Sequence, residues 1–211
     1  MKQTNTISVT TEHDLHTNDI KDFNEVYLLL HGYLLDGGYM YKKLRETLPK
    51  DALIIAPNGP FLVPYKKGEA YLPKYAWYFF DPSLKTFYIN YEPAAEYIKT
   101  ILEKYNPDKK PVNIIGYSQG GYLSPKIAEI IPEVKRVIGL ACVFRHTKFE
   151  YRSDITYHQI HGNNDLAVEM PGALEEWAIL KDKGNQGQFI ELDEVGHKLN
   201  EEFLNALKDI L

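Results

Sequence analysis

The chain contains a serine between two glycines, in the pattern Gly116-Tyr117-Ser118-Gln119-Gly120. A serine hydroxyl is a poor nucleophile at neutral pH unless a neighbouring base takes its proton. An apolar run that begins at Val112 leads into this serine, and a helical pattern follows it. This strand, turn and helix order predicts a sharp turn that presents Ser118 as a nucleophile. The alternative is an ordinary strand-to-helix turn that contains a serine.

Two later side chains have the chemistry that such a serine needs. His197 follows the last predicted strand, next to Gly196, and Asp165 follows a strand that ends in His161-Gly162. The chain order Ser, Asp, His is expected when the nucleophile lies in mid-sheet and its partners follow on later strands. We therefore predict Ser118 as the nucleophile, His197 as the general base and Asp165 as the carboxylate that orients the imidazole.

Other carboxylates compete with Asp165 for this role. Asp154 precedes its strand and so falls at the wrong end of the sheet, and Asp193 lies only four residues before His197. A turn-stabilising role for Asp165 is a further alternative, because aspartate is common in turns.

The remaining histidines have other expected roles. His31 and His161 each precede a glycine at a strand end, where we expect them to hydrogen-bond and orient loops. No pair of histidines has zinc-ligand spacing, so we predict no metal and no cofactor. His13 and His16 lie in the polar N-terminal segment, and His146 and His158 have the pattern of loop and strand residues.

Acyl chemistry also needs donors for a developing oxyanion. The backbone N–H of Gln119 opens the helix after the serine, where the helix N-terminus favours negative charge. The second predicted donor is the backbone N–H of Tyr33, which follows His31-Gly32 after an early strand. The alternative for this loop is a tight turn that serves packing alone.

Alternating strand and helix patterns must position these residues. A β-then-α rhythm predicts a mostly parallel sheet with helices on both faces and functional groups at the carboxyl ends of its strands. The predicted strands are Glu25 to His31, Ala52 to Ala56, the run from Val112 to the turn at Ser118, Lys135 to Val143, Ile155 to His161 and Gln188 to Leu192. Ile7 to Thr10 is a candidate edge strand. The predicted helices are Tyr39 to Leu48, Glu92 to Tyr105, Tyr122 to Ile131, Pro171 to Lys183 and Glu201 to Leu211.

Residues 57–91 differ from the rest of the chain. Eleven of its 27 aromatic residues fall between Phe61 and Tyr91, and Pro64, Pro73 and Pro82 interrupt any long regular element there. So long a connection in a compact domain is usually functional or disordered, and the aromatic content argues against disorder. We interpret it as a wall of the substrate pocket, with a satellite core as the alternative. The predicted pocket residues are Leu34, Leu35, Trp77 and Leu166.

Length and composition limit the class of protein. A chain of 211 residues fits one domain with a sizeable core, here 1–211. Its net charge of −5 argues against nucleic acid as a partner. The single Cys142 excludes an intramolecular disulfide and lies in an apolar run, as expected of a buried side chain. No signal peptide or membrane span is visible, so a cytoplasmic enzyme is expected. A homodimer stays open, with the aromatic segment as its candidate surface.

Taken together, these motifs make the sequence similar to α/β-hydrolases, and more narrowly to the phospholipase/carboxylesterase family that includes the acyl-protein thioesterases. The resemblance is carried by Leu30-His31-Gly32, Gly116-Tyr117-Ser118-Gln119-Gly120-Gly121, His161-Gly162-Asn163-Asn164-Asp165 and Gly196-His197, with Ala76-Trp77-Tyr78-Phe79-Phe80-Asp81 as a weaker match. It departs from the family at Tyr33-Leu34-Leu35, where a Gly-rich run is usual, and in the loop after Asp165.

The resemblance implies an α/β-hydrolase fold and hydrolysis of carboxylic esters or thioesters through an acyl-serine intermediate. We therefore expect a small-molecule ester of short or medium acyl chain as the substrate. Two alternatives are a non-catalytic small-molecule binding module on the same fold and an acyltransferase.

Overall fold

A computed structural model describes residues 14–18, 20–81, 83–84 and 86–211. Seven strands form the main sheet, in the order β1-β3-β2-β8-β9-β10-β11, and all neighbours are parallel except β1 and β3. The strands of this sheet are β1 Leu15–Thr17, β2 Val26–Leu30, β3 Leu53–Pro57, β8 Val112–Tyr117, β9 Val134–Leu140, β10 Thr156–Gly162 and β11 Phe189–Leu192.

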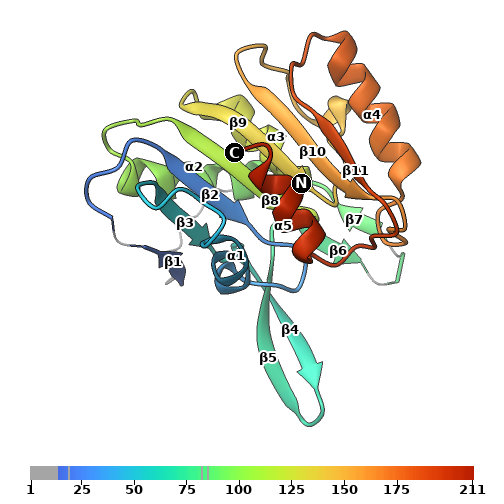
Figure 1. Cartoon of the computed structure of the whole chain (residues 1–211). Helices are drawn as coiled ribbons and strands as arrows, with labels where there is room; N and C mark the ends of the chain where they lie inside the picture. The colour runs from blue at the N-terminus through green and yellow to red at the C-terminus, as the bar shows by residue number, and fades with distance from the viewer. Residues whose placement is uncertain (1–13, 19, 82, 85) are drawn as a thin grey trace, which may run out of the picture.

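Helices cover both faces of this sheet (Figure 1). They are α1 Gly37–Leu44, α2 Glu92–Tyr105, α3 Gln119–Ile130, α4 Met170–Asp182 and α5 Glu201–Lys208, with a 3₁₀ turn, η1, at His146–Lys148. All five residues of β2 are buried, and they alternate between the two faces. Leu28 packs in the core shared with α2, α3 and α4, whereas Leu29 packs in the core shared with α1 and α5. The mostly parallel sheet with helices on both faces is therefore confirmed.

Two antiparallel ribbons stand apart from the main sheet. The strands β4 Phe61–Lys67 and β5 Ala70–Ala76 form a hairpin that projects from the body, and β6 Phe79–Asp81 pairs with β7 Thr86–Tyr88 (Figure 1). The prolines did not prevent regular structure here, contrary to the prediction. Pro64 lies directly opposite Pro73 in the hairpin. Because both strands of a two-stranded ribbon are edges, such a pair is tolerated where no ladder hydrogen bond is needed. Pro82 lies outside the described residues.

The starts of two helices differ from the prediction for local reasons. Helix α1 begins at Gly37 because the Asp36 side chain accepts from the backbone N–H of Tyr39 at 2.8 Å and caps the helix. Helix α3 begins at Gln119, ahead of two glycines whose low helix propensity concealed its start.

The edge strand β1 is not among the predicted strands, because its three residues are too few to form a recognisable pattern. The predicted strand Ile7 to Thr10 lies outside the described residues. No helix in the described part of the chain is both long enough and apolar enough to cross a membrane.

Candidate active site

The turn between β8 and α3 holds Ser118 in a strained conformation. Its backbone has φ 49° and ψ −117°, a region that residues with a side chain rarely adopt. Its backbone N–H donates to the Leu140 carbonyl at 2.8 Å, which ties the turn to β9. Gly116 and Gly120 allow this crossing, because a Cβ at either position would lie within 2.5 Å of neighbouring atoms. The structure thus has the sharp strand-to-helix turn that the motif predicts.

Three of the predicted side chains lie in one hydrogen-bonded line. His197 Nε2 is 3.0 Å from Ser118 Oγ, and His197 Nδ1 is 2.7 Å from Asp165 Oδ2. The Asp165 side chain is fully buried, whereas the His197 side chain is 28% exposed. This geometry allows the imidazole to donate from Nδ1 to the carboxylate and to accept from the serine hydroxyl at Nε2.

The loop after β10 holds the carboxylate in place. Asp165 Oδ1 accepts from the backbone N–H groups of Ala167 and Val168, both at 2.9 Å, and this leaves Oδ2 for His197. The competing carboxylates have other partners. Asp154 pairs with Arg152 at 2.7 Å, and Asp193 accepts from the Asn163 amide at 2.9 Å. Asp165 is therefore the carboxylate that the fold brings to His197.

The loop after β2 has two backbone N–H groups that donate to carbonyls within the protein. Leu34 has φ 61°, and its N–H donates to the Tyr75 carbonyl at 3.0 Å. The N–H of Leu35 donates to the Gly32 carbonyl at 3.1 Å. Across the site, Gln119 is the first residue of α3, so its N–H has no carbonyl one turn earlier to bind within the helix. Tyr33 and Gln119 therefore stay the predicted oxyanion donors.

A cavity of about 570 Å³ opens at Ser118 and His197. Aromatic and aliphatic side chains dominate its wall, as in most small-molecule sites. The lining residues are Gly32, Tyr33, Leu35, Tyr78, Phe87, Ile89, Tyr117, Ser118, Gln119, Tyr122, Arg145, Ala167, Val168 and His197.

The structure brings Leu35 of the four predicted pocket residues to this cavity. Trp77 is fully buried instead, and its indole N–H donates to the His31 carbonyl at 2.8 Å. Leu34 is not in the cavity wall, since its backbone turns away to pair with Tyr75. Leu166 is 90% exposed, and its neighbours Ala167 and Val168 line the cavity in its place. The prediction was wrong for Leu34, Trp77 and Leu166.

Sequence reasoning also missed the roles of two side chains that position the site. The Tyr117 hydroxyl donates to the His197 carbonyl at 2.7 Å and thereby holds the histidine loop. The Gln119 side chain accepts from the Trp77 N–H and donates to the Tyr78 carbonyl, both at 2.9 Å. Both residues lie inside the Gly-x-Ser-x-Gly motif, and their position beside Ser118 was the signal that could have identified them.

His31 and His161, which each precede a glycine, hold loops in place through hydrogen bonds. His31 Nδ1 lies 2.7 Å from the Gly32 carbonyl, and its Nε2 accepts from the Gly59 N–H at 2.8 Å. Burial lowers the pKa of His31 to about 4, because a charged imidazole would lose its hydration there. His161 Nε2 lies 2.8 Å from the Val168 carbonyl, so it steadies the loop that carries Asp165.

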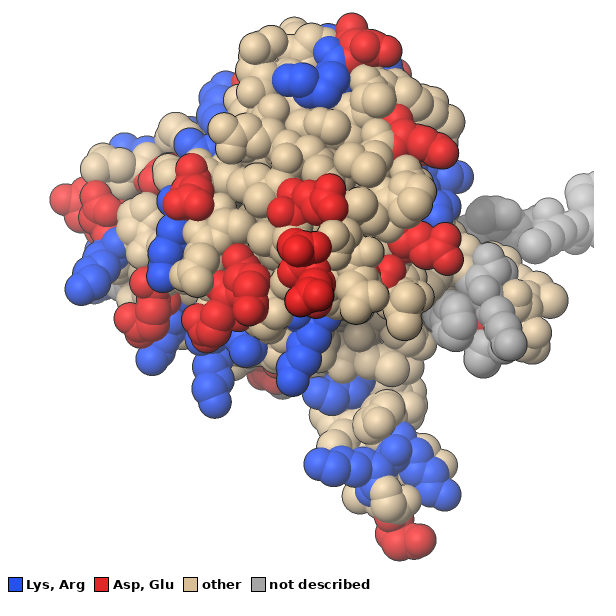
Figure 2. Space-filling view, turned by 45° about the vertical axis from the view of Figure 1, so that its right-hand side comes forward, with Lys and Arg blue, Asp and Glu red and all other residues tan. Residues whose placement is uncertain are grey.

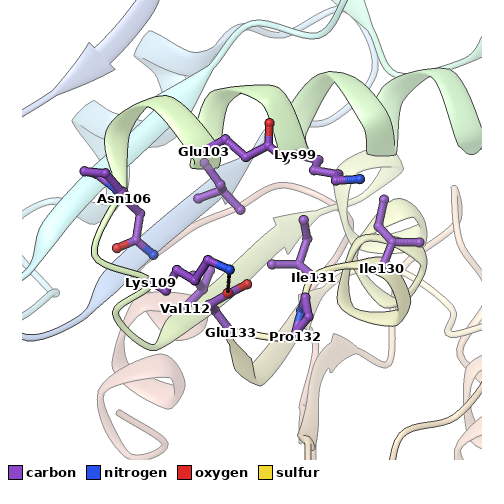
Figure 3. A pocket seen from close by; sticks show the side chains of 11 residues that line it. Lys99, Glu103, Asn106, Lys109, Val112, Ile130, Ile131, Pro132 and Glu133 are labelled. Carbon is purple, nitrogen blue, oxygen red and sulfur yellow. Dashed lines mark ion pairs between the residues drawn. The ribbon is translucent and has the colours of Figure 1, made fainter.

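A second cavity lies at the opposite end of the sheet. It adjoins Val112 at the start of β8, together with Asn106, Lys109 and Glu133 (Figure 3). The ion pair between Lys109 and Glu133, with an N–O distance of 4.0 Å, crosses it. No serine, threonine, cysteine or histidine lines this cavity, in contrast to the cavity at Ser118.

Comparisons with known proteins agree with this fold. The phospholipase/carboxylesterase family model matches residues 17–211. Zea mays acyl-protein thioesterase 2 superposes with a TM-score of 0.73 and 19% identity, covering 94% of this chain and 97% of that one. Esterase PE8 gives 0.70 and 20% identity, covering 96% and 100%, and a Mesorhizobium loti carboxylesterase gives 0.69 and 15%, covering 93% of each chain. No curated protein sequence matches this chain.

The sheet order, the strained serine turn and these superpositions define an α/β-hydrolase fold. Within that fold, the chain belongs to the phospholipase/carboxylesterase family. Membership in this family supports an enzyme of the esterase and thioesterase type.

Proposed function

We propose that this protein is a serine hydrolase that cleaves carboxylic esters, or thioesters, of short or medium acyl chain through an acyl-serine intermediate. The observation that carries the proposal is the line from Ser118 Oγ through the His197 ring to Asp165, with its distances of 3.0 and 2.7 Å. The fully buried carboxylate stabilises the imidazolium that forms when the serine loses its proton.

In the proposed reaction, His197 Nε2 takes the Ser118 proton as Oγ attacks the carbonyl carbon of the ester. The N–H groups of Gln119 and Tyr33 stabilise the oxyanion of the tetrahedral intermediate. The imidazolium then gives its proton to the leaving alkoxide or thiolate, and an acyl-serine forms. Water, deprotonated by the same imidazole, attacks the carbonyl carbon of the acyl-serine. The bond to Oγ then breaks, the imidazolium returns its proton to Ser118, and the carboxylic acid is released.

The cavity supports a substrate of limited size. Its volume of about 570 Å³ lies within the usual range of small-molecule sites, about 300–1,000 Å³. Leu35, Ile89 and Val168 give its wall an apolar character that suits an acyl chain.

The test combines labelling with turnover. A fluorophosphonate should modify Ser118, and Ser118→Ala should lose labelling and at least about 10⁴-fold in the rate of p-nitrophenyl acetate hydrolysis while keeping its fold. Ser124→Ala is the matched control, since Ser124 is buried in α3 and its hydroxyl donates to the Gly120 carbonyl. Wild-type turnover by Ser118→Ala would overturn the proposal. A series of acyl-chain lengths then measures the reach of the pocket, and added alcohol separates hydrolysis from acyl transfer.

A further inference from the structure

The active-site cavity carries one permanent cation in an otherwise neutral wall. Of its described lining residues, Arg145 is the one that is charged at every physiological pH. The chain as a whole has a net charge of −5, so its overall field repels anionic molecules. The Arg145 guanidinium places a positive charge in the wall of the cavity that also holds Ser118.

Arg145 forms no ion pair with any residue that the structure describes. The Glu176 carboxylate lies near the loop that follows Phe144, but it binds His146. It is 2.8 Å from the backbone nitrogen and 2.5 Å from Nδ1 of that histidine. The Arg145 charge is therefore available to a molecule in the cavity.

The surroundings hold this arginine in place. The guanidinium carbon lies 5.4 Å from the centre of the Tyr122 ring, a cation–π contact with a second lining residue. Phe144 and Phe149 are buried on either side of Arg145 in the chain and anchor the loop. Burial raises the pKa of Tyr122 to about 12, and the nearby Arg145 charge opposes that rise.

We propose that Arg145 determines substrate specificity by binding a carboxylate on the ester substrate, so that the preferred esters are anionic. The inference rests on the proposed ester hydrolysis and adds the substrate class. A guanidinium offers several N–H donors in one plane, and two of them can bind a carboxylate together. Because the wall offers a single cation, it matches a carboxylate better than a phosphate, which carries more charge.

The test uses pairs of esters that differ only in charge. Monomethyl adipate and methyl hexanoate have acyl chains of equal length, and only the adipate chain ends in a carboxylate. On the alcohol side, 6-acetoxyhexanoate and hexyl acetate differ in the same way. We expect Arg145→Gln to lower kcat/KM for the anionic member of at least one pair by about tenfold or more, mainly through KM, while both neutral esters change less than twofold. Arg145→Lys should retain part of the preference.

A matched control comes from the same loop. Lys148 is exposed and does not line the cavity, so Lys148→Gln makes the same change in net charge without removing the proposed contact. We expect it to leave both ester pairs unchanged. Raising the ionic strength from about 0.01 to about 0.15 M shortens the Debye length from about 30 to about 8 Å and should weaken the preference of the wild type. Equal losses on neutral and anionic esters in Arg145→Gln would overturn the inference.

Binding measured without turnover separates this inference from the proposed reaction. In Ser118→Ala, monomethyl adipate should bind about tenfold more weakly once Arg145→Gln is added, as calorimetry can measure. Ester hydrolysis at Ser118 with an unchanged preference in both pairs would overturn the inference alone. Failure of labelling and turnover, with Arg145-dependent binding intact, would overturn the proposed reaction alone.

Discussion

The main sheet buries its apolar side chains, whereas the hairpin β4–β5 exposes many of its apolar side chains to solvent. Every residue of β2 is buried, whereas the first four residues of β5 are exposed. Tyr71 is 66% and Leu62 60% exposed on this hairpin, which also carries three lysines and projects from the body (Figure 2). An isolated two-stranded ribbon is marginal in water, so the hairpin depends on its base.

That base is joined to the active site. Tyr75 N–H donates to the Leu35 carbonyl at 3.2 Å and its carbonyl accepts from Leu34, so the end of β5 holds the loop that carries Tyr33. The next residues, Trp77 and Tyr78, are held by the Gln119 side chain. The main-sheet strands thus carry the proposed reacting groups at their carboxyl ends, and the aromatic segment lines the cavity around those groups.

The largest expected effect lies at the carboxyl ends of the main-sheet strands. Asp165→Asn should reduce kcat for p-nitrophenyl acetate about 10⁴-fold, because the amide no longer holds the imidazole in the tautomer that accepts from Ser118. Asp193→Asn makes the same change at a carboxylate bound to Asn163, and its kcat should stay within twofold of the wild type. Retention of more than a tenth of the activity by Asp165→Asn would assign the orienting role elsewhere.

The next effect tests the link between the two regions. Gln119→Leu leaves the buried Trp77 N–H and Tyr78 carbonyl without the amide that binds them. Each unsatisfied buried group costs about 1–3 kcal/mol, so we expect the free energy of unfolding to fall by about 2–6 kcal/mol in urea titrations. Gln186→Leu is the control, since Gln186 is exposed and should change stability by less than about 0.5 kcal/mol. Equal stability of the two variants would contradict the link.

The lowered pKa of His31 predicts that the free energy of unfolding depends on pH. Its folded pKa of about 4 lies below the ordinary value of 6.5, so unfolding takes up a proton as the pH falls. The stabilisation is complete above pH 6.5 and is lost as the pH approaches 4. Between pH 8 and 5 the wild type should lose about 2 kcal/mol more unfolding free energy than His31→Gln. Burial also lowers the pKa of His158 to about 4, and the paired measurement cancels its effect. Parallel pH profiles would contradict the assignment.

The smallest effect concerns the tip of the hairpin. Tyr65 lies directly opposite Leu72, so an Asn-Gly turn can replace residues 66–71. The unfolding free energy should change by less than about 0.5 kcal/mol and turnover by less than twofold, because the removed residues are exposed. Tyr75→Pro, at the base of the same hairpin, removes the N–H that binds Leu35 and should lower kcat more than the truncation does. The reverse order would mean that the tip acts on the site.

The same contrast explains how far the sequence could be interpreted. Strands buried on both faces give continuous apolar runs, so β2, β3 and β8 were predicted from the sequence. The hairpin gave no such signal, because its apolar residues face solvent and its prolines suggested irregular structure. The pocket wall was the least predictable part. Trp77 and Leu166 are apolar, as the wall of a pocket requires, but neither lines the cavity. Trp77 is fully buried, and Leu166 is 90% exposed.

The sequence alone determined the fold class and the types, chain order and strand-end positions of Ser118, Asp165 and His197, because these follow from periodicity and from local turn chemistry. Only the tertiary structure decided which carboxylate meets the histidine, and that Arg145 shares a cavity with the serine. The physical reason is that contacts between loops depend on how strands far apart in the chain pack together. No local pattern records that packing.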